Sequence, residues 1–151
     1  MLTDVLTDAV DGRAIRALSL ASELLCDRGA LLVRARTLTF VPGERAWTRV
    51  LDTPDADAWL IAWDGSSRVG AHDHGGSHGA VHVLQGTLTE SYRPNPKEAT
   101  ERVRHITRGT TLTIPEDHVH DVANLGRRRA LSLHVYSPRL TSMTFYPPVP
   151  G

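Results

Sequence analysis

The stretch His72-Asp73-His74-Gly75-Gly76-Ser77-His78-Gly79, with Gly86 beyond it, indicates the fold of this chain more clearly than any other. Side chains two positions apart on an extended strand point to the same face, so the imidazoles of His72 and His74 can converge on one metal ion. A single histidine on a strand is more often a hydrogen-bonded structural residue than a ligand. The pair therefore needs a third donor, and a second stretch, from Gly109 to Asn124, supplies further histidines.

Short runs of strand-forming residues, separated by turn residues, follow Pro42-Gly43. The predicted strands are 47–51, 58–63, 80–84, 88–92, 101–106, 110–114, 118–122 and 130–136. Short strands at this spacing are typical of a double-sheet barrel or jelly roll.

The first third of the chain is predicted to be helical. Apolar residues recur at helical spacing from Gly12 to Arg28, and Gly29 is a plausible stop. The stripe consists of Ile15, Leu18, Ala21, Leu24 and Leu25. We expect Cys26 to be a core or boundary thiol. The whole chain, 1–151, is predicted to be one domain, with a helical segment over 1–40 and a β-barrel over 45–146.

Both histidine stretches resemble the two motifs of the cupin jelly-roll barrels. The first motif has His-x-His, a glutamate and a glycine; here His72, His74 and Gly86 fit, while Gly79 stands where the glutamate would be. The second motif is matched by Gly109, Pro115, His120 and Asn124, with Asp117 in place of a glycine. His118 competes for the role of third ligand, but the spacing to Asn124 favours His120. The resemblance implies a mainly β cupin fold with N-terminal helices and a metal held by His72, His74 and His120.

The missing glutamate bears on the chemistry of the metal. Three neutral imidazoles leave a divalent ion with its full charge, which favours an anionic substrate ligand such as a thiolate. Three protein ligands also leave positions open for a substrate and dioxygen. We expect iron, Fe(2+), and a zinc site that activates water is the rival.

The strand Ser132-Leu133-His134-Val135-Tyr136 alternates polar and apolar residues, so Ser132, His134 and Tyr136 share one face. Alternation alone does not say which face looks into the barrel. Arg49 lies on another predicted strand that is otherwise apolar in character, and an arginine inside a barrel would need an anion such as a substrate carboxylate.

From about Trp47 to Phe145 the chain resembles cysteine dioxygenase, the thiol dioxygenase branch of the cupins, on the run 72–86, the segment 132–138 and the pair Thr48-Arg49. The resemblance implies catalytic roles for Ser132, His134 and Tyr136, and a cis bond between Ser137 and Pro138. By the same resemblance, the expected substrate-binding residues are Arg49, Trp63 and Met143.

Two positions depart from that family. Animal members have a cysteine at the position of Gly79, joined covalently to the tyrosine that matches Tyr136, so Tyr136 is expected to be an unmodified phenol, as in bacterial relatives. The usual tyrosine two residues before the arginine is Trp47 here, and its indole offers no hydroxyl to a carboxylate.

The resemblance implies an iron-dependent oxidation of L-cysteine by dioxygen to cysteine sulfinic acid. Two alternatives stay open: a dioxygenase of another small thiol such as 3-mercaptopropionate, and a non-catalytic cupin that binds a metal or a small ligand. Relatives that use 3-mercaptopropionate tend to lack the arginine that matches Arg49, which favours cysteine.

Composition adds several expectations. Acidic and basic residues balance at 17 each, which gives no electrostatic ground for binding nucleic acid or anionic lipid. No apolar run reaches the roughly 20 residues that span a bilayer, and the N-terminus lacks a signal pattern. One cysteine cannot form an internal disulfide. We therefore expect a cytoplasmic protein, a monomer or a weak homo-oligomer.

Overall fold

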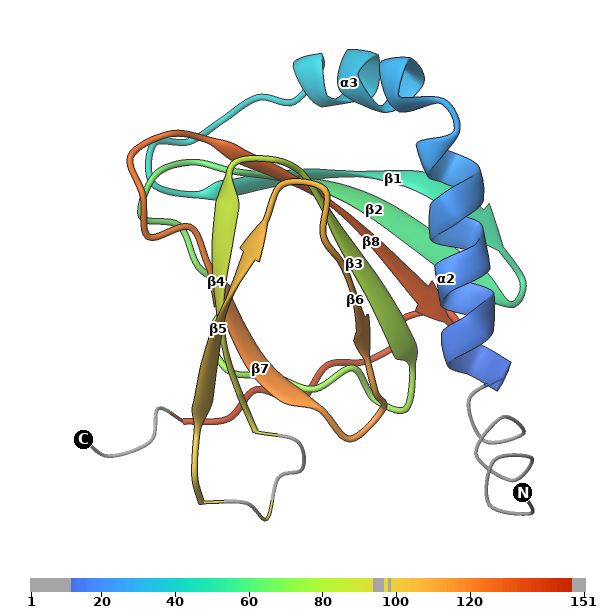
Figure 1. Ribbon diagram of the computed structural model, residues 1–151, viewed down its shortest axis with the longest axis vertical. Coiled ribbons are helices and arrows are strands. Elements are labelled where there is room, and N and C mark those ends of the chain that lie inside the picture. Colours follow the sequence, from blue (N-terminus) through green and yellow to red (C-terminus); the bar gives the residue numbers. More distant parts are fainter. Residues whose placement is uncertain (1–11, 94–96, 98, 148–151) are drawn as a thin grey trace.

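The computed structural model describes residues 12–93, 97 and 99–147. These residues contain two helices and eight strands (Figure 1). The helices are α2 (Gly12–Leu25) and α3 (Arg28–Arg36). The strands are β1 (Arg45–Thr53), β2 (Ala56–Trp63), β3 (His78–Gln85), β4 (Thr87–Arg93), β5 (Arg102–Thr107), β6 (Thr111–Ile114), β7 (Val119–Ala123) and β8 (Ala130–Ser137). Residues 1–11 of the predicted helical segment lie outside this part of the chain.

The strands form two antiparallel sheets that enclose a barrel interior (Figure 1). One sheet has the order β1-β2-β8-β3-β6 and the other the order β5-β4-β7. β8 lies between β2 and β3, so the last strand of the chain is inserted between two strands that are consecutive in the sequence. The mainly β, double-sheet architecture predicted from the sequence is confirmed.

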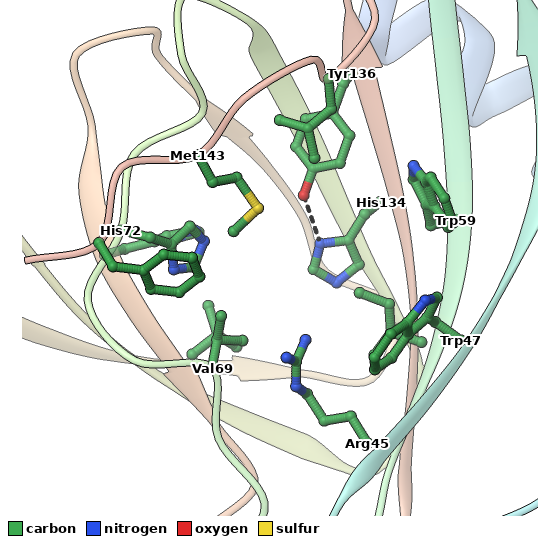
Figure 2. A pocket seen from close by; sticks show the side chains of 13 residues that line it. Arg45, Trp47, Trp59, Val69, His72, His134, Tyr136 and Met143 are labelled. Carbon is green, nitrogen blue, oxygen red and sulfur yellow. Dashed lines mark hydrogen bonds between the residues drawn. The ribbon is translucent and has the colours of Figure 1, made fainter.

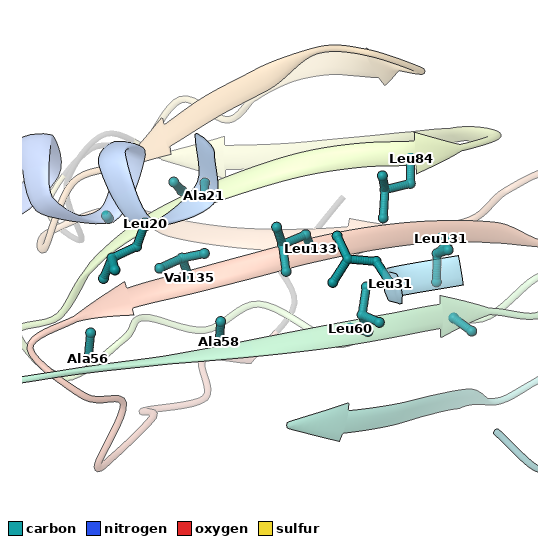
Figure 3. Close-up of a cluster of buried hydrophobic side chains, with 13 residues drawn as sticks. Leu20, Ala21, Leu31, Ala56, Ala58, Leu60, Leu84, Leu131, Leu133 and Val135 are labelled. Atoms are coloured by element: carbon teal, nitrogen blue, oxygen red, sulfur yellow. The ribbon is translucent and has the colours of Figure 1, made fainter. Parts of the chain in front are cut away.

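β8 has one apolar and one polar face, and the structure shows which of them points inward. Leu131, Leu133 and Val135 pack against the helices, in the cluster of Figure 3. His134 and Tyr136, on the other face, line a cavity inside the barrel. Burying the leucines under the helices therefore points the polar residues of β8 toward the interior.

The helical segment differs from its prediction. The expected single helix, ending before Gly29, is instead two: α2 ends at Leu25, and α3 begins at Arg28 and contains Gly29. The reason is an N-terminal cap, because the carboxylate of Asp27 accepts a hydrogen bond of 3.0 Å from the backbone N–H of Ala30 and restarts the helix.

The buried face of α2 follows most of the predicted stripe, because Ala21 is buried and Leu18, Leu24 and Leu25 pack against the core. Its buried residues are Ala17, Leu20 and Ala21, whereas Ile15 is 53% exposed. Small residues let the helix approach the sheet closely, and it packs against β3 and β8. Cys26 is exposed, contrary to expectation, because α2 has ended before it.

Candidate metal centre and active site

The backbones of His72 and His120 form a hydrogen-bonded antiparallel pair. The N–H of each residue donates to the carbonyl oxygen of the other at 2.9 Å. Side chains of directly opposed residues in such a pair leave the sheet on the same side. Two histidines that are 48 positions apart in the sequence are therefore held next to each other by the backbone.

A glycine turn follows His74 and leads into β3. Gly75 has a φ of +57°, and a Cβ there would lie 2.1 Å from Oγ of Ser142, so a larger residue does not fit. Asp73 fixes the same turn to the C-terminal segment, because its carboxylate accepts hydrogen bonds from the Gly75 N–H and from the hydroxyl of Tyr146. The expected extended pair His72-x-His74 therefore lies in a loop anchored on both sides rather than in a long strand.

The three imidazoles form a nearly equilateral triangle. Ring centroids are 4.9 Å apart for His72 and His74, 4.7 Å for His72 and His120, and 4.8 Å for His74 and His120. One nitrogen from each ring lies within 4.8 Å of the others. All three side chains are buried. The structure therefore brings together the three residues named from the sequence motifs.

Hydrogen bonds assign the outer nitrogens of two rings. Nδ1 of His72 lies 2.7 Å from the carbonyl oxygen of Gly70 and donates to it. Nδ1 of His120 lies 2.8 Å from Oε1 of Glu90 and donates to it. In both rings the proton is then on Nδ1, and Nε2 carries the lone pair that a metal ligand needs.

The geometry fits a metal ion. Nε2 of His74 and Nε2 of His120 are 3.2 Å apart, and two nitrogens at about 2.1 Å from one ion are separated by roughly 3.0–3.4 Å in octahedral or tetrahedral geometry. Nδ1 of His74, on the outer side of the ring, is buried without a hydrogen-bond partner among the described residues, and Nε2 is the atom that faces the other rings. An ion bound to the three Nε2 atoms would give each facing lone pair a partner.

Burial keeps these rings neutral. Burial, together with the neighbouring His120, lowers the pKa of His72 to about 4 and the pKa of His74 to about 2. The pKa of His120 is also lowered by burial, against the opposing effect of Glu90. Neutral imidazoles are the form that binds metals, so near neutral pH the ligands need lose no proton first.

A cavity of about 260 Å³ opens beside this triangle (Figure 2). Its lining is mostly apolar, with an arginine, three histidines and a tyrosine as the polar groups. The lining residues are Arg45, Trp47, Trp59, Ile61, Val69, His72, His120, Val122, His134, Tyr136, Leu140, Met143 and Phe145. Met143, expected from the sequence near the substrate, is among them.

Tyr136 connects the cavity to the triangle. Its ring stacks on His74 with a centroid distance of 5.3 Å and an interplanar angle of 29°. Burial raises the pKa of Tyr136, so the phenol keeps its proton. A Cβ on Gly79 would lie 3.3 Å from Cε1 of Tyr136, which shows how closely the backbone of β3 passes this ring.

A line of hydrogen bonds runs from Trp63 to Tyr136. The indole N–H of Trp63 donates to Oγ of Ser132 at 2.9 Å, and Oγ of Ser132 lies 2.8 Å from Nε2 of His134. Nδ1 of His134 is 3.4 Å from the hydroxyl of Tyr136. Burial lowers the pKa of His134 to about 3, so the ring is neutral.

The direction of these bonds follows from the donor at the start. An indole can only donate, so Ser132 accepts from Trp63. Nε2 of His134 is the other hydrogen-bond partner of the same hydroxyl, so we assign the proton of Ser132 to that contact. His134 then carries its proton on Nδ1 and directs it at the oxygen of Tyr136. Because that oxygen is an acceptor toward His134, the Tyr136 O–H is left to donate toward the cavity. Trp63 itself does not line the cavity, contrary to its expected place beside the substrate.

Arg49 does not line the cavity either, although the sequence pointed to it as the anchor for a substrate carboxylate. It is exposed, its guanidinium pairs with Asp52 at 3.1 Å and lies over the ring of Trp59 at 4.5 Å. A shift in the β1–β2 register directly after Arg49 marks the point where the strand becomes irregular. Its side chain is therefore engaged at the edge of the barrel.

Arg45 is the arginine that points into the cavity (Figure 2). Arg45 lies four residues before Arg49 on β1, on the same face of the strand. Its guanidinium carbon is 5.4 Å from the ring centroid of Trp47 and 5.5 Å from that of Trp63. None of the described carboxylates forms an ion pair with it. Burial lowers its pKa, so the site holds a partly desolvated cation.

Two residues of this site escaped the sequence analysis, Arg45 and Glu90. Arg45 is an even number of residues from Arg49 on the same strand, so both side chains are on the same face of β1. This alternation was the sequence feature that could have pointed to Arg45 as a second candidate. Glu90 lies in β4, four positions after Gly86, where an alternating strand gave no sign of its partners. The peptide bond between Ser137 and Pro138 is cis, as the family resemblance implied.

The sequence model of the family described as cysteine dioxygenase type I matches residues 8–147. The chain belongs to this family. Membership indicates a cupin dioxygenase, and the buried histidines form a group that could hold a metal. None of the described helices is long and apolar enough to cross a membrane.

Solved structures agree on the fold at low sequence identity. KdgF from a Halomonas species is 20% identical, with a TM-score of 0.56 over 68% of this chain and 86% of that one. An uncharacterized conserved protein with a double-stranded β-helix domain from Klebsiella pneumoniae is 18% identical, with a TM-score of 0.59 over 73% of this chain and 90% of that one. At these identities the likeness shows the fold alone.

Proposed function

We propose that this protein is an iron(II)-dependent thiol dioxygenase that oxidises L-cysteine with dioxygen to cysteine sulfinic acid. The observation that carries the proposal is the convergence of three neutral histidines beside a cavity that contains one arginine and a tyrosine O–H. Family membership supports the reaction class.

His72, His74 and His120 would hold the iron. When bound, iron(II) supplies coordination of the thiol sulfur and the redox chemistry with dioxygen, while the protein positions and polarises. The absence of a carboxylate among these three ligands keeps the charge of the ion undiminished, which favours a thiolate over a thiol.

The carboxylate of the substrate is assigned to Arg45 rather than to Arg49. The Arg45 guanidinium faces the cavity, is partly desolvated and has no carboxylate partner among the described residues, whereas Arg49 already pairs with Asp52. A guanidinium binds a carboxylate with two parallel hydrogen bonds, which fixes the orientation of the substrate as well as its position. Contact with Trp47 and Trp63 holds the planar group in place.

Tyr136 would donate its proton in a hydrogen bond to the reacting groups. The bond from Nδ1 of His134 orients the phenol oxygen, and the raised pKa of Tyr136 keeps its proton in place near neutral pH. Ser132 and Trp63 in turn keep His134 in one tautomer. Leu140, Met143 and Phe145, from the segment after β8, add apolar side chains to the lining of the cavity.

A second candidate keeps the iron chemistry and changes the thiol to one without an ammonium group, such as 3-mercaptopropionate. The supporting observation is that no aspartate or glutamate is among the lining residues, so a substrate ammonium has no anionic partner there. Cysteine fits if its amine, in the neutral form, binds the metal instead.

The deciding experiment is oxygen uptake by iron-loaded protein with L-cysteine and, separately, with 3-mercaptopropionate, together with quantification of the sulfinic acid. Uptake that matches sulfinate formation from cysteine supports the proposal. Uptake with 3-mercaptopropionate alone moves the assignment to the second candidate. No uptake with either thiol at full iron occupancy rejects both and favours a binding cupin.

A further inference from the structure

Glu90 is a fully buried carboxylate that points at the back of one metal-binding histidine. Its exposed fraction is 0%, and it lies on β4, beside β7, the strand that carries His120. Oε1 is 2.8 Å from Nδ1 of His120 and 2.9 Å from Nε2 of His118. Oε2 accepts a hydrogen bond from Nε of Arg104.

The hydrogen-bond inventory determines the protons in this group. Nε of Arg104 can only donate, so Glu90 is ion-paired with a permanent cation and is an ionised carboxylate, whose two oxygens can only accept. His118 and His120 are therefore both donors toward it. For His120 this leaves Nε2 without a proton, and that atom faces Nε2 of His74 at 3.2 Å.

Glu90 also bears on the departure seen at Gly79. The cupin motif would place a glutamate on the metal at that position, and glycine removes one negative charge from the ligand set. Glu90 brings a negative charge back, one hydrogen bond further out, through the imidazole of His120. A carboxylate that accepts the N–H of a ligating imidazole makes the opposite nitrogen a stronger donor.

We propose that Glu90 is a positioning residue that fixes His120 as the Nδ1–H tautomer and supplies, through that ring, negative charge to the metal that Gly79 does not supply directly. Arg104 moderates this charge, because it pairs with the far oxygen of the same carboxylate. The inference rests on the three-histidine metal centre of the proposed function, but not on the identity of the thiol.

Glu90, His118 and His120 could also be read as a metal site in their own right, since their donor atoms lie within 4.8 Å of one another. Two observations favour the positioning role. An ion in that place would lie beside the guanidinium of Arg104, and it would compete for the nitrogen of His120 that already donates to Oε1. The two readings make opposite predictions for His118 and His74.

The test is anaerobic titration of metal-free protein with Fe(II), and with Co(II) as a spectroscopic probe, in the absence of thiol and dioxygen. Glu90→Gln keeps the size and one acceptor oxygen but removes the charge. We expect its metal affinity to fall by about 10- to 100-fold, the range typical for partners behind a ligating histidine. The Fe(III)/Fe(II) potential should rise, because less negative charge stabilises the ferric ion.

Arg104→Met is the matched variant, since it leaves the carboxylate in place and removes the cation that neutralises it. It should bind metal as tightly as the wild type or more tightly, with a lower potential. If Glu90 matters for folding alone, both variants weaken metal binding in parallel with their thermal stability, and the proposal is rejected. Arg104 is partly exposed, so its variant gives a folded protein to measure even where Glu90→Gln does not.

His118→Phe and His74→Ala distinguish the two metal readings. The positioning role requires that His118→Phe keeps stoichiometric metal and that His74→Ala loses it. The reverse pattern would overturn the proposal in favour of a site at Glu90. A protein with normal metal titrations but no thiol oxidation would leave Glu90's role intact while rejecting the proposed function.

Discussion

The indole Nε1 of Trp63 donates a hydrogen bond of 2.9 Å to the hydroxyl of Ser132 on the neighbouring strand. Because an indole cannot accept, the Ser132 oxygen is the acceptor here, and His134 is the other partner to which the serine hydroxyl can give its proton. With that assignment the hydrogen bonds run through His134 to the oxygen of Tyr136. A residue that does not line the cavity thereby determines that the Tyr136 hydroxyl is free to donate into it.

Trp63→Phe should lower kcat by about 10-fold with little change in KM, because losing a partner behind a catalytic group typically costs 10- to 100-fold. Without the indole donor, Ser132 can rotate, and His134 loses its fixed tautomer. The measurement is steady-state oxygen uptake, combined with a double-mutant cycle with Ser132→Ala. The double variant should be no slower than Ser132→Ala alone; additive losses would show that Trp63 acts independently of the serine.

Arg45→Met and Arg49→Met form a matched pair of variants, since the two arginines lie on the same face of β1, two residues before and two residues after Trp47. Arg45→Met should raise KM for a carboxylate-bearing thiol by about 10- to 100-fold, the equivalent of one lost charge-assisted hydrogen-bonded pair. Arg49→Met should change KM by less than about twofold, because it removes an exposed ion pair with Asp52 and a contact with the ring of Trp59, but no group that itself lines the cavity.

Cysteamine, a thiol without a carboxylate, is the control substrate for that pair. Its turnover should be the same in Arg45→Met as in wild type. Quenching of the fluorescence of Trp47 and Trp59 by an unreactive short carboxylate gives a second readout that needs no iron, since both indoles line the cavity. A raised KM in Arg49→Met with an unchanged one in Arg45→Met would return the carboxylate to the position expected from the sequence.

Gly79→Ala should lower kcat several-fold and destabilise the protein by about 1–3 kcal/mol, the usual cost of overpacking. The added methyl would lie 3.3 Å from Cε1 of Tyr136 and 3.2 Å from Cβ of Ile114, so the phenol must shift. Gly12→Ala is the control, because a Cβ there meets nothing within 4 Å. An unchanged kcat in a stable Gly79→Ala protein would show that Tyr136 tolerates displacement.

The sequence was sufficient to name His72, His74 and His120 as a candidate ligand set, because the two histidine stretches resemble the two cupin motifs. His72 and His74 flank one residue, and His120 belongs to a motif of its own, so no knowledge of pairing between strands was needed. The mainly β class followed from the spacing of strands and turns. Which face of β8 looks inward could not be decided, because the answer depends on where α2 and α3 pack.

Arg45 and Glu90 could not be found in the same way. Arg45 and Arg49 have the same parity on β1, and what separates them is an irregularity in the register after Arg49 and the ion pair with Asp52. Glu90 meets His120 across two strands whose sequences are 30 positions apart. Both assignments depend on register between strands, which no local pattern encodes.

Metal-free protein should lose stability as the pH falls from about 6.5 toward 5. The buried imidazoles of His72 and His134 have pKa values lowered to about 4 and about 3, against about 6.5 in the unfolded chain. Between these values the unfolded state binds protons that the folded state does not, so acidification favours unfolding. Above about 6.5 both states are neutral at these rings and their full contribution to stability is present.

Each such histidine contributes a slope of up to roughly 1.4 kcal/mol per pH unit in that range. The measurement is the free energy of unfolding by urea between pH 8 and pH 5, in the presence of a chelator. His134→Gln should make this slope smaller, by up to the contribution of one proton. A wild-type stability that is flat across this range would mean that these rings take up protons in the folded state as readily as in the unfolded one.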